Sequence, residues 1–591
     1  MATIIVDFAT FDANQPYSAS DTVIVQDTAA NLQALTAVQI AELGSGNADF
    51  VDSLSDVLIL NATQAAAFGD ISTAFDPSDF VQISDTGANI ATLTATEIAA
   101  LASHGLAAIN PSDNVLSFDV AQFQALGQIS VNAGATFTLA DTGANIAALT
   151  AGQIGALSLQ GVDVIDATNN TLSLSVAQYQ ALGTVALTAL DTVTLSDTGA
   201  NLAALTATQI GQLAGNGIDA IDATNNALSL TVAQYSALGS VTLTAGDTVT
   251  LADTGANLAA LTTTDIDNLT NVDILNATDS ALSMTIAQLQ EIQADGIDMT
   301  ASNTLTLSDT EANIEGLGAS DVLTDLAGFG TDFLHASDTS TINADAALIS
   351  EVETAAVAFT AGDTATFSDT GADIAGLSAV QLSLLVASNV DKIDATDNAL
   401  SLSLAQYDAI TIGIAKNDAL TVTGTSAANT ISGHAGIDIL NGLGQADTLN
   451  GLGGNDTLVG GSGNDTENGG NGNDTLNGGT GADDLTGGKG ADTFVFSSIS
   501  DSANNHQDVI EDFSHAQGDL IDLSAIDAKT GGADNAFHIV SAFTGAKGQL
   551  VITAHGTNEF LVRGDVNGDG RADFTIDVHS HTALTSGDFI L

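Results

Sequence analysis

Residues 433–495 read GHAGIDILN-GLGQADTLN-GLGGNDTLV-GGSGNDTEN-GGNGNDTLN-GGTGADDLT-GGKGADTFV. This segment specifies the fold of the C-terminal third. It consists of seven nonapeptides that follow one another without an insertion. Gly opens each unit, and Asp holds the sixth place in every one: Asp438, Asp447, Asp456, Asp465, Asp474, Asp483 and Asp492. A large apolar residue holds the eighth place in six of the seven units. This strict period indicates stacked coils rather than a flexible glycine-rich linker.

The residue types at these places are those of a calcium-binding turn. Glycine allows a backbone with positive φ and leaves the carbonyl groups free to point inward. The fourth-place glycines are Gly436, Gly454, Gly463, Gly472, Gly481 and Gly490. Each Asp adds a carboxylate beside these carbonyls, and two turns from successive coils would supply six oxygens, which suits a hard cation. We therefore predict that these aspartates and glycines bind several Ca²⁺ ions.

Two units depart from the pattern. Gln445 replaces the fourth-place glycine, so the turn at Asp447 is expected to be strained or poor in metal. Glu467 replaces the eighth-place apolar residue and puts a carboxylate where the interior is expected. An earlier unit, GTSAANTIS from Gly424, has Asn429 in place of Asp, and we interpret it as a transition coil.

The nonapeptides resemble those of the RTX (repeats-in-toxin) proteins, over about residues 424–495. The resemblance implies a parallel β-roll with two nonapeptides in each coil and calcium between repeats n and n+2. The segments FVFSSISDS and DVIEDFSHAQGDLIDLSAIDA, which follow, resemble the C-terminal region of serralysin-type proteases. That region would form a β-rich cap over the roll.

The ends of the chain bear on its location. Asp588, Phe589, Ile590 and Leu591 resemble the acidic-then-apolar C-terminus of type I secretion substrates. This implies a type I exporter as a partner and a secreted, extracellular or cell-surface location. The N-terminal residues lack the basic and apolar regions of a cleavable signal peptide, which agrees with export by such a route.

A further acidic motif, GDVNGDGRADFTIDV, lies near the C-terminus. Asp565, Asn567, Asp569 and Asp573 begin like the calcium loop of an EF-hand, but the twelfth place holds Ile576 instead of Glu. The alternative is a β-hairpin with Asn-Gly or Asp-Gly at its tip. The sequence leaves a metal site and a hairpin equally open.

A longer repeat fills the preceding residues. The strings DTAAN, DTGAN and DTEAN, with one DTGAD, begin at Asp27, Asp85, Asp141, Asp197, Asp253, Asp309 and Asp369. Each copy contains two similar halves with an alternating strand, a polar turn and a short helix. The helix starts carry capping-box pairs: Thr150–Gln153, Ser175–Gln178, Thr206–Gln209, Thr231–Gln234 and Thr285–Gln288. The pattern predicts an α/β solenoid with coils of about 28 residues.

The alternative to the solenoid is a row of separate 56-residue domains, which is less favoured because one such unit would bury little core. The Asp-Thr-Gly-Ala-Asn turns could bind calcium, but turn chemistry already explains their Asp, Asn and Gly, and we favour a scaffold role. The aromatic residues Phe123, Tyr179, Tyr235 and Tyr407 recur at helix spacing and are expected in the core.

Together the patterns predict a repeat protein. We expect an N-terminal segment over residues 1–20, the α/β solenoid over 21–420, the all-β calcium-binding β-roll over 421–495, and the C-terminal cap over 496–591.

Composition narrows the range of partners. The chain has 72 acidic and 7 basic residues, a formal net charge of −65, and no Lys or Arg before Lys392. Such a surface repels nucleic acid and anionic lipid, so neither is an expected partner. No apolar run is long enough to span a membrane, and we expect no membrane insertion. There is no cysteine, so calcium is the expected stabilising crosslink.

The sequence favours a structural or adhesive protein over an enzyme. None of the nine His is followed by Glu, so the H-E-x-x-H zinc site of the serralysin protease domain is missing, and no G-x-S-x-G motif is present. The same acids recur in every copy, as a scaffold does. We expect a surface-layer, biofilm-matrix or adhesin component, with self-assembly or a cell-surface polysaccharide as candidate interactions. The alternatives are a polysaccharide-active hydrolase and an RTX toxin.

Overall fold

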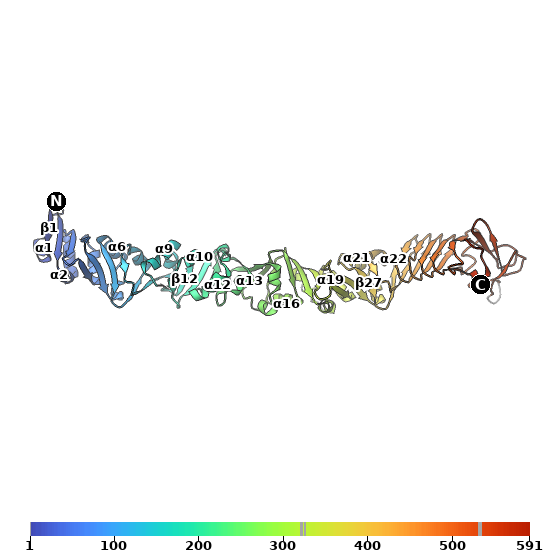
Figure 1. Cartoon of the computed structure of the whole chain (residues 1–591), viewed down its shortest axis with the longest axis horizontal. Helices are drawn as coiled ribbons and strands as arrows, with labels where there is room; N and C mark the ends of the chain where they lie inside the picture. The colour runs from blue at the N-terminus through green and yellow to red at the C-terminus, as the bar shows by residue number, and fades with distance from the viewer. Residues whose placement is uncertain (1, 320–322, 324–326, 530–534) are drawn as a thin grey trace. The chain divides into compact units, whose positions relative to one another are not determined.

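The computed structural model describes residues 2–319, 323, 327–529 and 535–591, and Figure 1 gives the order of its elements. It forms two compact units. One contains the residues up to Ser280 together with Gln293–Thr300, and the other contains Ala281–Ile292 together with Ala301–Leu591. The chain opens with β1 (Thr3–Val6) and α1 (Phe8–Asn14).

Each copy of the long repeat contributes four strands. The first has six residues: β2 (Thr22–Asp27), β6 (Phe80–Asp85), β10 (Thr136–Asp141), β14 (Thr192–Asp197), β18 (Thr248–Asp253), β22 (Thr304–Asp309) and β26 (Thr364–Asp369). The second follows after the helices: β3 (Phe50–Ser53), β7 (Leu106–Pro111), β11 (Val164–Ala167), β15 (Ala220–Ala223), β19 (Ile274–Ala277), β23 (Thr331–Ala336) and β27 (Lys392–Ala395). The third comes after a tight turn: β4 (Val57–Leu60), β8 (Val115–Phe118), β12 (Thr171–Leu174), β16 (Ala227–Leu230), β20 (Ala281–Met284), β24 (Thr341–Ala344) and β28 (Ala399–Ser403). The fourth is short: β5 (Ala74–Phe75), β9 (Ser130–Val131), β13 (Ala186–Leu187), β17 (Thr242–Leu243), β21 (Asp298–Met299), β25 (Ala358–Phe359) and β29 (Gly413–Ile414).

Short helices connect these strands. One follows each Asp-Thr turn: α2 (Ala29–Gln33), α5 (Gly87–Ile90), α8 (Gly143–Ala147), α11 (Gly199–Ala203), α14 (Gly255–Ala259), α17 (Glu311–Glu315) and α20 (Gly371–Gly376). A second comes directly after it: α3 (Ala37–Ser45), α6 (Ala95–His104), α9 (Ala151–Leu157), α12 (Ala207–Leu213), α15 (Thr263–Asp267) and α21 (Ala379–Leu384). A third follows the third strand: α4 (Ala62–Gly69), α7 (Val120–Ala125), α10 (Val176–Ala181), α13 (Val232–Ser236), α16 (Ile286–Ala294), α19 (Ala346–Ala355) and α22 (Leu404–Ala409).

The predicted capping boxes are confirmed. Thr206 Oγ1 accepts a hydrogen bond from the Gln209 amide, and Gln209 Oε1 accepts one from Thr206 N–H. The capping glutamine of the third helix has a second use, because its Nε2 donates to two carbonyls between the first two helices of the neighbouring coil. Gln234, for example, donates to Ala203 and Leu205, at 2.8 and 2.6 Å. One side chain therefore starts a helix and joins two coils.

The sheets interlock from copy to copy. In the parallel four-stranded sheet β12-β14-β15-β17, strand β12 precedes β13 in the chain, yet β13 belongs to the sheet before it, β13-β11-β10-β8. The chain thus enters the next sheet and returns before leaving the first. Because no 56-residue segment completes its own sheet, the long repeats form an α/β solenoid and not a row of separate domains. Residues that pair between the strands of this sheet are 21 to 26 positions apart in the chain, slightly fewer than the predicted coil length of about 28.

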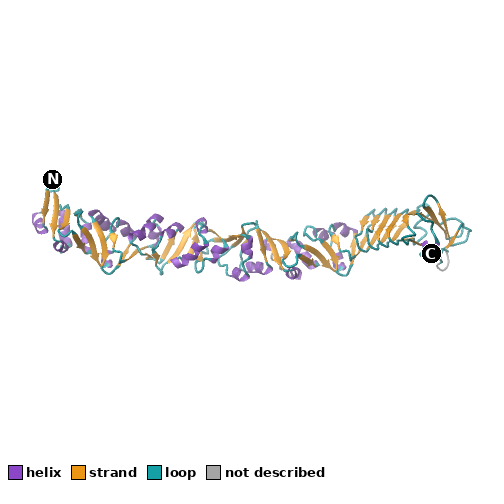
Figure 2. Ribbon diagram, in the orientation of Figure 1, coloured by secondary structure: helices purple, strands orange, loops and turns teal. Residues whose placement is uncertain are grey.

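The RTX-like region is a two-sheet roll that continues directly from the solenoid. One sheet has the order β28-β30-β32-β34-β36-β38-β40-β45, with β30 (Ala419–Thr423), β32 (Asp438–Gly444), β34 (Thr457–Ser462), β36 (Thr475–Thr480), β38 (Thr493–Val495), β40 (Leu520–Asp522) and β45 (Phe589–Ile590). The other has the order β31-β33-β35-β37-β39-β44-β43-β42-β41. Its strands are β31 (Thr430–Ser432), β33 (Thr448–Asn450), β35 (Thr466–Asn471), β37 (Asp484–Lys489), β39 (Asp508–Phe513), β41 (His538–Val540), β42 (Gln549–Ala554), β43 (Glu559–Asp565) and β44 (Phe574–Ser580). Figure 2 shows the helices of the solenoid giving way to strands and loops in the roll.

Helices in this structure are short. Among the residues that the structure describes, none has both the length and the apolar character needed to cross a lipid bilayer.

Candidate metal centre

Successive nonapeptides go to opposite sheets of the roll, so two of them make one coil of 18 residues. In one sheet Leu440 pairs with Leu458, which pairs with Leu476, and in the other Leu449 pairs with Glu467. The eighth-place side chains therefore form two columns that fill the interior. Each repeat aspartate lies at the turn just before its strand.

The seven repeat aspartates are buried and form two ladders. None exposes more than 2% of its surface. The amide N–H of each Asp donates to Oδ1 of the Asp one coil later, at 2.7 Å from Asp447 to Asp465 and 2.8 Å from Asp465 to Asp483. The second ladder runs through Asp438, Asp456, Asp474 and Asp492, at 2.8 to 2.9 Å. Every repeat carboxylate except that of Asp438 is thereby held at Oδ1 by a backbone amide one coil earlier.

The other carboxylate oxygen has no protein partner in six of the seven. The following Oδ2 atoms are buried and have no hydrogen-bond donor among the described residues: those of Asp447, Asp456, Asp465, Asp474, Asp483 and Asp492. A buried carboxylate oxygen without a donor is strongly unfavourable unless a proton or a cation compensates it. The donor set is all oxygen, which is the chemistry of a hard divalent ion. These residues therefore fit bound calcium.

The pKa values of these carboxyl groups also reflect their burial with too few hydrogen-bond donors. Burial raises the pKa of Asp456 and Asp483 to about 7, and that of Asp465 and Asp474 to about 6, against the opposing backbone hydrogen bond that each accepts. The neighbouring carboxylates of the same ladder add to the increase, as Asp438 and Asp474 do for Asp456. Without metal, these side chains thus take up protons at a much higher pH than an exposed carboxyl group does.

Asp438 is the exception at the start of its ladder. Its Oδ2 accepts the His434 amide at 2.8 Å, and its Oδ1 lies 2.7 Å from His434 Nδ1. The hydrogen bond to Asp438 raises the pKa of His434, although burial of the ring opposes this. His434 contacts both oxygens of Asp438 at this end, so Asp438 depends less on a metal than the aspartates that follow.

The fourth-place residues permit the close approach of successive coils. Positive φ values of 137° to 158° occur at Gly454, Gly463, Gly472, Gly481 and Gly490, but not at Gly436. A Cβ at Gly472 would lie only 1.4 Å from the Gly454 carbonyl oxygen. Gln445 has a φ of 70°, in the left-handed region that disfavours a side chain, in agreement with the strain that the sequence suggests at this turn.

Glu467 lies in the interior, in the column between Leu449 and Leu485. It is fully buried, and neither carboxyl oxygen has a hydrogen-bond partner among the described residues. The backbone groups of Gly460 and Asn477 oppose the rise in the pKa of Glu467 but do not outweigh its burial. Burial raises the pKa of Glu467 to about 8, and the charge of Asp483 adds to this. The roll contains an acid at a place that its pattern reserves for leucine.

The structure adds two aspartates that the nonapeptide pattern did not reveal. Asp483 N–H donates to Asp508 Oδ1 at 2.9 Å, and Asp492 N–H donates to Asp519 Oδ1 at 3.0 Å, so both ladders continue into the C-terminal region. Burial raises the pKa of Asp508 to about 9, and its Oδ2 has no donor among the described residues. The spacings of 25 and 27 residues break the nine-residue period. A signal was present, because Asp-x-apolar recurs at both places.

The EF-hand-like motif lies in the connection of a β-hairpin, between strands β43 and β44. Asp565 Oδ1 and Oδ2 accept the amides of Gly568 and Gly570, at 2.6 and 2.9 Å, and Asp573 accepts the amides of Val566 and Asn567. Asp569 accepts the Arg571 amide. The flanking helices of an EF-hand are replaced by strands, and the loop's own N–H groups bind its carboxylates. Metal binding by Asp565, Asn567, Asp569 and Asp573 stays a prediction.

The Asp-Thr-Gly turns of the solenoid are different from the roll turns. Asp197 Oδ1 accepts the Thr198 amide at 2.8 Å and Asn201 Nδ2 at 2.7 Å, and its Oδ2 accepts the Val176 amide at 3.0 Å. Burial would raise the pKa of Asp197, but these hydrogen bonds outweigh it and lower the pKa. The geometry is that of the scaffold role favoured from the sequence.

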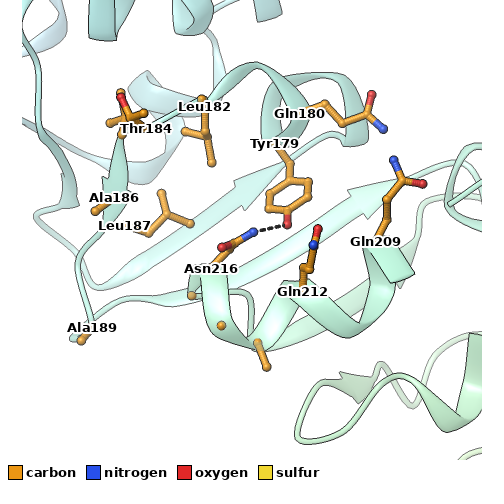
Figure 3. Close-up of a pocket in the computed structure, with 15 residues that line it drawn as sticks. Tyr179, Gln180, Leu182, Thr184, Ala186, Leu187, Ala189, Gln209, Gln212 and Asn216 are labelled. Atoms are coloured by element: carbon orange, nitrogen blue, oxygen red, sulfur yellow. Dashed lines mark hydrogen bonds between the residues drawn. The ribbon is translucent and has the colours of Figure 1, made fainter. Parts of the chain in front are cut away.

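The repeated tyrosines are not core residues, in contrast to the expectation from their spacing. Phe123 is buried, but Tyr179, Tyr235 and Tyr407 are half-buried, because their hydroxyl groups reach polar partners at the edge of the next coil. Tyr179 borders a groove of about 680 Å³, and Figure 3 shows the amide side chains of Gln180, Gln209 and Gln212 around its ring. Asn216 donates to the Tyr179 hydroxyl at 2.7 Å. None of the described residues that line this groove is charged.

A corresponding groove lies one repeat later. It has a volume of about 310 Å³ and is lined by Tyr235 with Asn268 and Asn271, again without a charged residue among those described. In a chain that carries 72 acidic residues, two uncharged grooves at equivalent places are a distinct surface feature.

The residues that resemble a type I secretion signal are part of the fold. Phe589–Ile590 forms β45 and pairs with β40. Asp588 is 1% exposed and accepts hydrogen bonds from Thr585. Truncation at this end therefore removes an edge strand as well as any export signal.

Comparison with known proteins identifies the type of the C-terminal region. The family model described as "Peptidase M10 serralysin C terminal" matches residues 413–591. The metalloprotease AprA of Pseudomonas entomophila (strain L48) is 42% identical over 96 residues, which are 16% of this chain and 19% of that protein. Residues 413–591 form a serralysin-like C-terminal region. The chain spans only about a fifth of the length of this curated relative.

One solved structure is also similar to this chain. The solution structure of the AlgE6R3 subunit from the Azotobacter vinelandii mannuronan C5-epimerase shares 24% sequence identity with it. The match covers 28% of this chain and 80% of that one, with a TM-score of 0.14.

Proposed function

We propose that this protein is a secreted, calcium-binding structural or adhesive protein whose roll folds when it binds calcium outside the cell. The observation that carries the proposal is the pair of carboxylate ladders, in which six buried Oδ2 atoms have no donor among the described residues. Calcium would supply the positive charge that these oxygens need. The binding free energy then becomes folding free energy, and extracellular modules of this kind typically bind calcium at about 10⁻⁴–10⁻³ M.

Export through a type I system agrees with this mechanism. A cytosol poor in free calcium would leave the roll unfolded, and the extracellular medium would fold it. The serralysin-like match over residues 413–591 supports secretion of this kind. Calcium would therefore control whether the C-terminal part of the protein is folded.

The adhesive role rests on the solenoid. The groove at Tyr179 offers an aromatic ring, amide donors and acceptors, and no charge among its described lining residues. A sugar ring stacks on an aromatic face, and its hydroxyl groups hydrogen-bond to amides, so the chemistry favours a neutral polysaccharide. The surface layer, a biofilm matrix and a cell-surface glycan are the settings in which such a protein would act, alone or by self-assembly.

We do not assign a catalytic activity. The sequence has no H-E-x-x-H, and the relative that shares the C-terminal region covers only 96 residues of this chain. A polysaccharide-active hydrolase and a toxin are the competing functions. The first would depolymerise a glycan, and the second would lyse lipid vesicles.

The test uses the full-length protein. Isothermal titration calorimetry with calcium should give at least three ions for the roll, together with a gain of β-structure by circular dichroism. Asp456→Asn, Asp465→Asn and Asp474→Asn combined should remove most of both signals. A stoichiometry of zero or one in the unmodified protein would refute the proposal.

Light scattering and a glycan array address the biological role. Calcium-dependent assembly or retention of a neutral glycan, without release of shorter products, supports the structural and adhesive reading. Tyr179→Ala should weaken glycan retention, and Phe123→Leu, in the buried equivalent position, should not. Depolymerisation of the glycan or lysis of lipid vesicles would instead establish one of the competing functions.

A further inference from the structure

The solenoid contains a second set of paired carboxylates, away from its Asp-Thr-Gly turns. In one copy, Asp222 in β15 faces the turn that precedes β18, where Asp247 lies. Thr244 Oγ1 is 3.1 Å from Asp222 Oδ1 and 2.7 Å from Asp247 Oδ2. A hydroxyl has one hydrogen and can donate it to only one of the two. The two carboxylates therefore share the Thr244 hydroxyl, while Ser196 Oγ donates to Asp222 Oδ2 and the Ala223 amide donates to Asp247 Oδ2.

The same pair occurs in two further copies. The strand residue is Asp52 or Asp166, and the turn residue is Asp79 or Asp191. Each turn carboxylate binds the backbone amide just after the strand residue, as Asp191 Oδ2 does with Ala167 at 2.8 Å. The strand carboxylates are half-buried, which leaves the pair open to solvent on one side.

The turn aspartates are more than nine-tenths buried. Asp79 is 9% exposed, Asp191 7% and Asp247 8%. The Oδ1 atoms of Asp79 and Asp191 are buried without a donor among the described residues. Burial raises the pKa of Asp191, the Ala167 amide opposes this, and the charge of Asp166 adds to the increase. The carboxylates of Asp79 and Asp191 thus each have one oxygen fixed by a backbone amide and one buried oxygen without a partner among the described residues.

The other copies show that the two positions change together. Where the turn residue is Ala135, the strand residue is Asn110, and the next residue, Pro111, has no N–H for a turn carboxylate to bind. In another copy the corresponding residues are Asn276 and Asn303. The strand residue is neutral in both copies that lack the turn carboxylate. Avoidance of repulsion would give the opposite pattern, with the strand acid where the turn residue is neutral.

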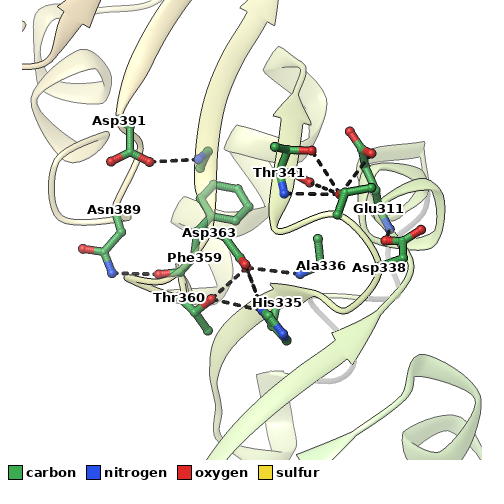
Figure 4. Close-up of polar contacts among 12 residues, drawn as sticks. Glu311, His335, Ala336, Asp338, Thr341, Phe359, Thr360, Asp363, Asn389 and Asp391 are labelled. Carbon is green, nitrogen blue, oxygen red and sulfur yellow. Dashed lines mark hydrogen bonds and ion pairs between the residues drawn. The ribbon is translucent and has the colours of Figure 1, made fainter.

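One copy replaces the strand acid by the only histidine between residues 105 and 433. His335 Nδ1 lies 2.9 and 3.0 Å from the two oxygens of Asp363, which also accepts Thr360 Oγ1 at 2.7 Å. Figure 4 shows these contacts around Asp363. Where the second carboxylate is missing, the protein thus supplies an imidazole to the turn carboxylate. The remaining copy, Asp394 with Asp418, lies near Lys392 and His434, which lower the pKa of Asp418 against the larger effect of its burial.

We propose that the pairs Asp52–Asp79, Asp166–Asp191 and Asp222–Asp247 each bind one hard divalent cation, Ca²⁺ or Mg²⁺. Two carboxylates, with a threonine hydroxyl in the third pair, form an all-oxygen set open to water, which is how such ions are bound. The ion takes the place beside the turn carboxylate that the His335 ring takes beside Asp363. These three sites are independent of the roll and would stabilise the solenoid coil by coil.

The experiment counts bound ions in the full-length protein, by equilibrium dialysis with Ca²⁺ and separately with Mg²⁺. The variant D52N/D166N/D222N should bind three ions fewer than the unmodified protein, because each pair loses one carboxylate. Asparagine should be tolerated there, because two natural copies already have it at this position. His335→Asp should bind one ion more, because it recreates the pair with Asp363. Asn110→Asp is the matched control and should add none, because Ala135 offers no second carboxylate.

Three ions lost with either cation, together with one gained by His335→Asp, support the proposal. An unchanged ion count in both the triple variant and His335→Asp overturns it, whatever the roll binds. If the triple variant does not fold, as judged by circular dichroism, the ion count of His335→Asp decides alone. Because none of these substitutions touches residues 424–591, binding by the roll is measured in the same samples.

Discussion

Asp197 of the solenoid and Asp465 of the roll have the same side chain and a place beside a strand, but they differ in burial and in their hydrogen-bond donors: Asp197 is half-buried and Asp465 is 1% exposed. Asp197 receives three N–H groups, two on one oxygen and one on the other. Asp465 receives one, on Oδ1, and its Oδ2 has none among the described residues. The pKa of Asp197 is lowered and that of Asp465 is raised to about 6. Burial together with a shortage of donors, and not the amount of acid, separates a carboxylate that needs a cation from a scaffold carboxylate.

Removal of calcium should have the largest effect, and it should unfold the roll while the solenoid stays folded. Hydrogen exchange of the full-length protein in excess chelator should show loss of protection across residues 433–529. The apolar strands of the solenoid should stay protected, with small losses near the three proposed carboxylate pairs. Equal loss throughout would show that the solenoid depends on calcium as much as the roll does. The full-length chain is needed, because β28, β30 and β32 belong to one sheet and a cut at residue 424 would break it.

The pH dependence of the metal-free roll should be opposite to that of most proteins. The folded-state pKa of Asp456 and Asp483 is about 7, far above the value of 3.8 for an exposed carboxyl group. The folded state then binds more protons than the unfolded state, so stability is full below about pH 4 and is lost as the pH rises to about 7. Thermal melts of decalcified protein should give a higher roll midpoint at about pH 4.5 than at about pH 7.5. With saturating calcium the order should reverse, and a metal-free roll that is more stable at the higher pH would contradict this account.

Single substitutions in the two regions test the comparison directly. Asp465→Ala should raise the calcium concentration needed for folding about tenfold or more, which is about 1.4 kcal/mol. Asp447→Ala should do less, because its turn already contains the strained Gln445. Asp197→Ala should lower the free energy of unfolding by about 1–3 kcal/mol, equally with and without calcium, because it leaves N–H groups without acceptors. Calcium titrations and urea melts give both quantities, and a calcium-dependent effect of Asp197→Ala would remove the distinction.

The sequence predicted the roll better than the solenoid, for a physical reason. The nonapeptide period fixes both the turn and the interior side chain, so the turn positions of Asp438 to Asp492 follow from local pattern, while the coil of two nonapeptides follows from the resemblance to RTX proteins. Asp508 and Asp519 could not be placed by that period, because a longer loop precedes each of them. The interlocked solenoid sheets depend on which strands pair, and the pairs such as Asp166 with Asp191 are 25 residues apart. The recurrence of the same acids in every copy predicts a scaffold role, and the hydrogen bonds of the Asp-Thr-Gly turns, such as those of Asp197, fit that role.

Glu467 offers a smaller effect within the roll. Its carboxyl group is buried without a hydrogen-bond partner among the described residues, which costs about 1–3 kcal/mol. Glu467→Leu should therefore stabilise the roll by about that amount and lower the calcium concentration needed for folding. The matched variant Leu485→Glu, in the next coil of the same column, should destabilise it. Urea melts at fixed calcium give the comparison, and a loss of stability in Glu467→Leu would indicate that the acid has a partner that the apolar column does not supply.

Gln445→Gly should have the smallest effect and should act through the backbone alone. A residue with a side chain at a φ of 70° costs about 1–2 kcal/mol relative to glycine in the folded state. Glycine is more flexible in the unfolded chain, which offsets about 0.5–1 kcal/mol of this gain. The net expectation is a stabilisation of about 0.5–1 kcal/mol, with a small decrease in the calcium midpoint, because the turn before Asp447 closes with less strain. Gln445→Ala is the control, since it removes the amide but keeps the strained φ, and it should give no stabilisation. If alanine stabilised the roll as much as glycine does, the amide side chain and not the backbone would be the source of the weakness at this turn.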